Sequence, residues 1–150
     1  MTLFARYRPT HAPGHIGVLL GWITALATGA RGLDYLSGPA RVGGPTLQVV
    51  ESYGSAHAWG AWMVAGFFAL AVSLLLRRIG PLIAAHLAGV FVYSWYGIAL
   101  VRGIAAAHGH GMRFATPVAA NLALHCVCLW LLGREVRRLA GPPAPLREVR

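Results

Sequence analysis

The polar side chains best able to form hydrogen bonds or bind a ligand lie inside two long apolar segments. Asn121, His125 and Cys128 are spaced i, i+4 and i+7, which places them on one face of a helix. His86 and Tyr93 share a broad face of the preceding apolar segment. Polar groups are costly at membrane depth and usually face protein or water. These five residues therefore predict an inward-facing polar surface.

His86 and His125 are placed to meet if the two segments are antiparallel helices. His86 lies five residues after Pro81 and His125 eight residues before Gly133, or about 8 and 12 Å from the same membrane face at 1.5 Å per residue. We interpret the pair first as an interhelical hydrogen bond that fixes register. Two alternatives remain open: a wet polar seam that opens on assembly, and axial ligation of a haem by His86 and His125.

The chain has few of the side chains and motifs that catalysis requires. It contains four acidic residues and no zinc motif, phosphate loop, nucleophile elbow or paired-carboxylate site. His108 and His110 have no acid or cysteine near them in sequence to complete a metal site. We therefore expect no enzymatic activity, no catalytic residue, no metal and no cofactor, with the b-type haem kept as an alternative.

The composition indicates a membrane protein. The 150 residues are 57% hydrophobic and 11% charged, whereas a soluble domain is usually about a quarter charged. The formal net charge is +9, and all thirteen basic residues are arginine, because the chain has no lysine. These arginines flank apolar segments rather than forming one basic face, so we expect them to anchor helices in a lipid bilayer and to bind no nucleic acid.

Four segments are long and apolar enough to cross a bilayer, which takes about 20 residues. A spanning chain must satisfy its backbone internally, so we expect helices. The predicted fold is an all-α polytopic protein, a single transmembrane domain over 1–150. The expected spans are 14–30, 57–76, 81–101 and 115–133.

The distribution of arginine predicts the orientation. Nine arginines fall in the N-terminal segment, the loop between the second and third spans, and the tail 134–150, against four in the other two loops. Positive residues are enriched on the cytoplasmic side. We therefore expect both termini and the tail to lie in the cytoplasm, and the protein to reside in the inner (plasma) membrane. Cleavage of the first span as a secretory signal is left open.

The long loop after the first span contains a predicted short helix. Pro45 suits a first helical position, and Leu47, Val50 and Tyr53 would then share one face, resting on the outer membrane interface. Small residues at four-residue spacing allow membrane helices to approach closely. The residues expected to serve such packing are Gly17, Gly21, Ala61, Ala65, Gly89 and Gly97.

Three functions fit a four-span protein with small loops. The first is a multimerising, holin-like protein that permeabilises the membrane, with the polar face as its pore lining and the arginine-rich tail regulating it. The second is an accessory or exclusion protein that binds another membrane protein. The third is a b-type haem electron-transfer protein. The expected partners are the bilayer and either further copies of this chain or another membrane protein.

One family resemblance bears on this choice. The run Ala30-Arg-Gly-Leu-Asp-Tyr-Leu-Ser-Gly-Pro, the segment Val49-Val-Glu-Ser and the start Ala58-Trp-Gly-Ala-Trp resemble small four-span membrane proteins of actinobacterial phages. The resemblance covers about the first half of the chain, and some members of that group are regarded as holin-like. It implies a membrane role and transfers no functional residue.

Overall fold

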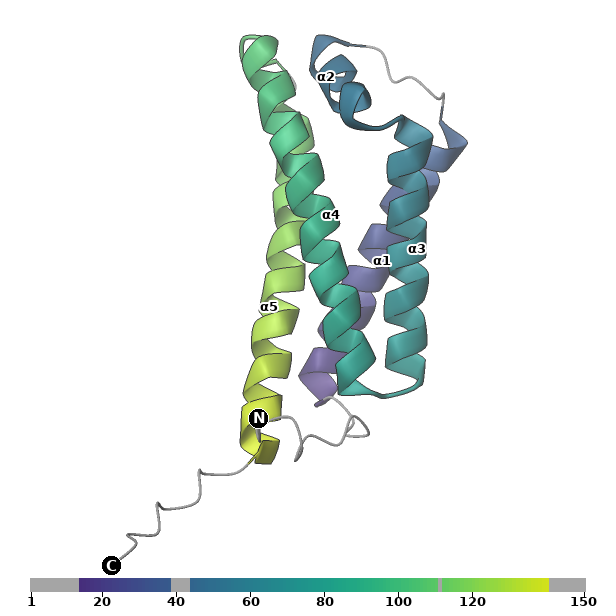
Figure 1. Ribbon diagram of the computed structural model, residues 1–150, viewed down its shortest axis with the longest axis vertical. Coiled ribbons are helices and arrows are strands. Elements are labelled where there is room, and N and C mark those ends of the chain that lie inside the picture. The colour runs from purple at the N-terminus through teal and green to yellow at the C-terminus, as the bar shows by residue number, and fades with distance from the viewer. Residues whose placement is uncertain (1–13, 39–43, 111, 141–150) are drawn as a thin grey trace, which may run out of the picture.

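Four long helices run side by side in a bundle, and a short fifth helix lies across one end (Figure 1). The computed structural model describes residues 14–38, 44–110 and 112–140. The helices are α1 (His15–Ser37), α2 (Pro45–Tyr53), α3 (Ala56–Leu75), α4 (Ile79–Ala106) and α5 (Ala115–Ala140), with a 3-10 turn over Met112–Phe114 before α5. The described residues contain no strand. The all-α fold is confirmed.

Length and composition make α1, α3, α4 and α5 membrane spans. They contain 23, 20, 28 and 26 residues, and 20 residues of α-helix are about 30 Å long, the thickness of a hydrocarbon core. All four are apolar enough to cross a bilayer. The protein is therefore a small multi-pass membrane protein.

Local sequence explains where these helices begin. The Ser55 hydroxyl accepts a hydrogen bond from the Ala58 N–H at 3.1 Å and caps α3. Pro45 occupies the first turn of α2, as predicted, and Pro81 and Pro117 lie in the first turns of α4 and α5. A proline there removes no helical hydrogen bond.

Three of the four long helices extend beyond the expected membrane spans. The helices continue past the expected span ends at Ala30, Val101 and Gly133, to Ser37, Ala106 and Ala140. Arginine follows each expected end, and arginine is a good helix former that can mark a membrane edge without ending the helix. Arg6, Arg8 and residues 141–150 of the predicted tail lie outside the described residues.

The two ends of the bundle differ in structure, and we name them the α2 end and the hairpin end. At the hairpin end α3 and α4 are joined through Arg77, whose φ of 50° reverses the chain, and α5 ends nearby (Figure 1). At the α2 end the Thr46 carbonyl lies against Gly103 of α4, where a Cβ would overlap it. The Thr46 hydroxyl also donates to the His110 carbonyl at 2.6 Å.

Helix α2 uses only part of its predicted face. Leu47 and Val50 are buried, whereas Tyr53 is exposed and accepts a hydrogen bond from Arg102 of α4. The structure therefore places α2 against the C-terminal half of α4, rather than packing it on α1 or α3.

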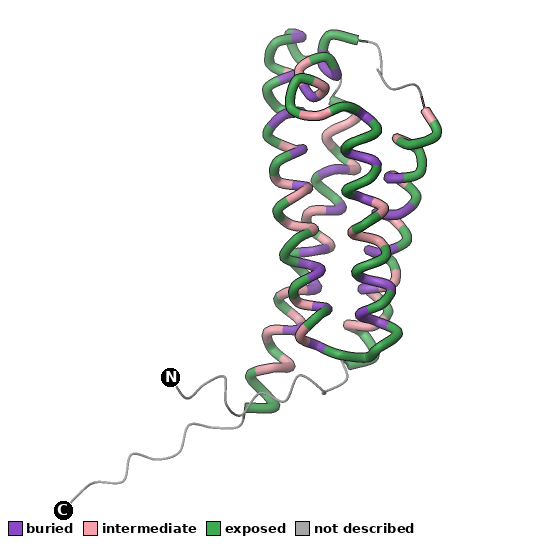
Figure 2. Tube along the Cα trace, turned by 45° about the vertical axis from the view of Figure 1, so that its right-hand side comes forward, coloured by how far each residue is buried: buried purple, intermediate pink, exposed green. Residues whose placement is uncertain are grey.

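Buried residues form a line along the inside of the bundle, and the outside is exposed and apolar (Figure 2). Two apolar clusters make up this interior. One, at the α2 end, includes Leu47, Trp59, Met63 and Leu100. The other, at the hairpin end, includes Leu70, Leu74, Ile79, Leu82 and Leu132.

Candidate functional site

Polar side chains from three helices meet between the two apolar clusters. His86 and Tyr93 come from α4, and Asn121, His125 and Cys128 from α5; all five are buried, with at most 6% of their surface exposed. The sequence predicted these five. Thr24 and Thr28 of α1 are also buried and complete the group. We call these seven residues the polar seam.

The two histidines are in direct contact at the centre of the seam. His86 Nδ1 and His125 Nδ1 are 3.0 Å apart and form a hydrogen bond, so one ring donates and the other accepts. The rings meet edge to face with centroids 5.1 Å apart. The expected interhelical hydrogen bond is therefore present. It joins α4 to α5 at one register.

This contact leaves no space between the two rings for a porphyrin. Axial ligation by both histidines would require a haem plane to separate the imidazoles. Here the two rings touch, and on the other side a Cβ at Gly89 would overlap the His125 ring. The predicted haem arrangement therefore does not fit this pair as the bundle holds it.

Helix α1 contributes two contacts that the sequence analysis missed. Thr28 accepts a hydrogen bond from the Tyr93 hydroxyl at 3.4 Å, and the Thr24 hydroxyl lies 3.7 Å from Cys128 Sγ. Thr24 and Thr28 are four residues apart and so share a helix face. This spacing in an apolar span is the signal that could have found them.

The seam contains more hydrogen-bonding atoms than partners. His86 Nε2, His125 Nε2 and Asn121 Oδ1 are buried without a hydrogen bond. The Asn121 amide nitrogen instead donates to the Pro117 carbonyl of its own helix at 3.1 Å. Each unpaired buried polar group costs about 1–3 kcal/mol. Entry of water would relieve this cost.

The predicted small residues have different positions in the bundle. Gly21 is buried against Leu74 of α3, while Gly17, Gly89 and Gly97 are half-buried. Ala61 and Ala65 are exposed on the outside of α3. Their row therefore faces away from the bundle interior and is accessible to a neighbour in the membrane.

Helix α3 contacts α1 through a different pair of glycines. A Cβ at Gly60 would lie 2.8 Å from the Gly32 carbonyl oxygen, and one at Gly32 would lie 3.0 Å from the Gly60 carbonyl oxygen. The two backbones therefore touch, which only glycine allows. Neither residue was in the predicted packing set.

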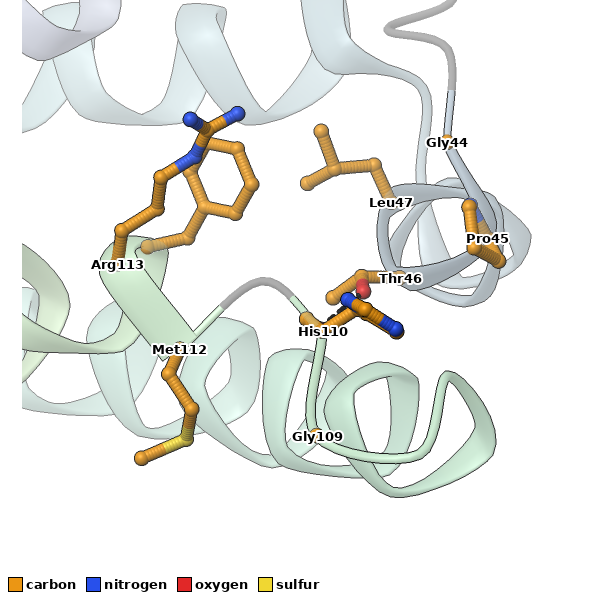
Figure 3. A pocket seen from close by; sticks show the side chains of 9 residues that line it. Gly44, Pro45, Thr46, Leu47, Gly109, His110, Met112 and Arg113 are labelled. Carbon is orange, nitrogen blue, oxygen red and sulfur yellow. Dashed lines mark hydrogen bonds between the residues drawn. The ribbon is translucent and has the colours of Figure 1, made fainter.

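A second candidate region is a cavity of about 510 Å³ at the α2 end (Figure 3). It lies between the start of α2 and the α4–α5 connection, with His110, Met112 and Arg113 on one side. The Arg113 guanidinium is 5.0 Å from the centre of the Phe114 ring. Within residues 14–38, 44–110 and 112–140, no three His, Cys, Asp or Glu side chains gather in a metal-binding group.

The two structures that distinguish this protein are thus the buried polar seam and the exposed alanine row of α3. The seam can exchange protons or admit water, and the row can accept another helix. Comparison of the chain with protein families, curated proteins and solved structures finds no match.

Proposed function

We propose that the protein self-associates in the bacterial inner membrane and permeabilises it in the manner of holins, when its polar seam fills with water. The observation that carries this proposal is the set of three unpartnered buried atoms, His86 Nε2, His125 Nε2 and Asn121 Oδ1. The closed bundle leaves them unsatisfied, and a water-filled bundle would satisfy them. Hydration of these three atoms therefore favours opening of the closed bundle.

The position of the seam supports a gated path. It lies between the apolar cluster at the α2 end and the one at the hairpin end. Apolar constrictions close water-filled paths because a narrow apolar neck expels water. The bundle then holds its polar groups dry until the helices separate, and self-association through exposed helix faces supplies the force that separates them.

The two cysteines of α5 provide a built-in test. Cys128 is buried in the seam and Cys126 is exposed on the lipid-facing side of the same helix. A charged methanethiosulfonate reagent reacts with thiolate in water. We expect it to label Cys128 in the Cys126→Ser variant after induction collapses the membrane potential, but not before.

The matched control is Cys128→Ser, which leaves only Cys126. That variant should stay unlabelled before and after induction, because its thiol faces lipid. Potential is followed with a voltage-sensitive dye in the same cells. Normal growth and an unchanged potential with abundant inserted protein would reject the proposal, as would a collapse of potential with Cys128 unlabelled.

Substitution of a seam residue provides a second test of the same proposal. Asn121→Leu removes an unpartnered buried oxygen, and we expect it to delay permeabilisation strongly. Leu122→Ala changes the neighbouring residue, which is only half-buried, and should change the timing little. Equal effects would make this face ordinary packing.

A second candidate function is binding of another membrane protein as an accessory or exclusion factor. The exposed row at Ala61 and Ala65 favours it, because close helix packing requires small residues and none of the helices that the structure describes covers them. Ala61→Leu should then release a stoichiometric partner after mild solubilisation. Recovery of a homo-oligomer alone would favour the holin-like function.

A further inference from the structure

A groove of about 560 Å³ opens on the outside of the bundle between α3 and α4. Trp62, Phe91 and Trp95 line it and are exposed, so its mouth lies on the surface that faces lipid. Both flanking helices are membrane spans. Molecules dissolved in the bilayer can therefore enter this lateral groove directly. Its volume is in the range of small-molecule sites.

The walls of the groove carry two buried polar groups that lack partners. Trp59 is 6% exposed and His125 1%, and both line the groove. Trp59 Nε1 and His125 Nε2 have no hydrogen bond. Indole N–H only donates, and His125 Nε2 donates in one of its neutral tautomers. An acceptor oxygen can therefore satisfy each of them.

The two groups are separated by about two helical turns in depth. The Trp59 ring packs edge to face on Tyr96, with centroids 5.1 Å apart, and a Cβ on Gly89 would lie 2.6 Å from His125 Nε2. Gly89 lies seven residues before Tyr96 in α4, a rise of about 10 Å. A six-membered ring with carbonyl oxygens at opposite ends, extended by a hydrogen bond of about 2.9 Å at each oxygen, spans a distance of this order.

The shape of the groove suits a flat ring. Small residues, including Gly66, Ala85 and Gly89, line its inner part and leave it unfilled. Aromatic rings stand at its mouth, where Phe91 and Trp95 stack at 24° to one another. Flat aromatic surfaces pack favourably on such rings.

We infer that the lateral groove binds a membrane-dissolved amphiphile whose flat ring carries carbonyl oxygens, the chemistry of an isoprenoid quinone. The ring lies inward, where Trp59 and His125 donate to its oxygens, and the apolar tail leaves between α3 and α4 into the lipid. This inference does not depend on permeabilisation, because it concerns the closed bundle.

The test is tryptophan fluorescence of the purified full chain in lipid nanodiscs, titrated with a short-chain menaquinone. Trp59, Trp62 and Trp95 line the groove, whereas Trp22 and Trp130 do not. In a Trp22→Phe, Trp130→Phe background we expect saturable quenching. A compound with the same ring but no carbonyls, 2-methylnaphthalene, should give no saturable phase.

Two variants locate the hydrogen bonds. Trp59→Phe and His125→Phe each remove one donor and keep an aromatic ring, and we expect each to weaken binding about tenfold, the equivalent of about 1.4 kcal/mol. Phe68→Ala is the control, because Phe68 is exposed on α3 and does not line the groove. It should bind as the parent does. Thermal unfolding of each variant checks that it remains folded.

Three results would overturn the inference. Quenching that rises linearly and equally in all variants would show simple partition into the bilayer. A phospholipid that co-purifies with the parent and is lost in Trp59→Phe would show a lipid occupant. Disulfide cross-links between two copies of a Trp62→Cys, Cys126→Ser variant, with no quinone effect, would show that another helix fills the groove.

Discussion

Helix α3 contacts its two neighbours in opposite ways. Against α1 it packs closely, with Gly60 on Gly32 and backbone touching backbone. Toward α4 it approaches at the hairpin end but leaves the lateral groove along its length. Close backbone contact holds the first pair, whereas α4 is held to its other neighbours by the polar contacts of the seam together with the two apolar clusters. The comparison separates a rigid unit, α1 with α3, from a part that is able to rearrange.

The largest expected effect comes from breaking the rigid pair. In Gly60→Ala the new methyl would lie 2.8 Å from the Gly32 carbonyl oxygen and 2.9 Å from the Leu36 side chain. Overpacking of this kind costs about 1–3 kcal/mol, and we expect the upper end because backbone must move. Unfolding in mixed micelles measures it.

Gly66→Ala on the same helix is the control for that variant. Its methyl would lie 3.7 Å from Thr28 Cγ2, an ordinary contact, so stability should change by less than about 0.5 kcal/mol. If the two variants lose the same stability, then α1 and α3 are not a close-packed pair.

The second effect tests the seam through the glycine beside it. Gly89→Ala would place a methyl over the His125 ring and force the ring away from His86. We expect a loss of about 1–2 kcal/mol together with loss of the shared proton signal in the imidazole ¹⁵N spectrum. Gly97→Ala, whose methyl would lie 3.8 Å from Val118, should leave that spectrum unchanged.

The third effect measures the histidine pair itself. His86→Leu or His125→Leu alone leaves the other ring without its partner, and we expect each to cost about 1 kcal/mol, the lower end of the range for an unpaired buried group. The double variant should cost less than the sum, because no unpaired imidazole remains. Additive losses would mean that the 3.0 Å contact contributes no coupling.

The smallest effect is expected at the contact between α2 and α4, outside both the α1–α3 contact and the polar seam. Tyr53→Phe removes the acceptor for Arg102, a contact between exposed side chains that joins α2 to α4. Exposed charged contacts contribute little, so stability should fall by less than about 1 kcal/mol. A loss as large as that of Gly60→Ala would place α2 within the rigid part.

Hydropathy was sufficient to predict the four spans, because long apolar segments without charge have few other structures available. Helix ends were not predictable from arginine, since Arg31, Arg102 and Arg134 lie within continuing helices. The meeting of His86 and His125 followed from antiparallel geometry and similar depth alone.

The remaining features depend on which helix becomes a neighbour, and that information is not local. Thr24 and Thr28 belong to the seam because α1 packs beside α5 and α4. Ala61 and Gly60 are adjacent in sequence and both small, yet Gly60 is buried against α1 while Ala61 faces outward. Composition does not distinguish them, because the difference is one of helix rotation.

The attachment of α2 has a mechanical consequence. The Thr46 hydroxyl donates to the His110 carbonyl, and the Thr46 backbone contacts Gly103. This short helix therefore connects the last turns of α4 with the loop that leads to α5. A protein fragment that binds α2 from the aqueous side would thus restrict the movement of α4. It would change the motion of the membrane helices without itself entering the bilayer.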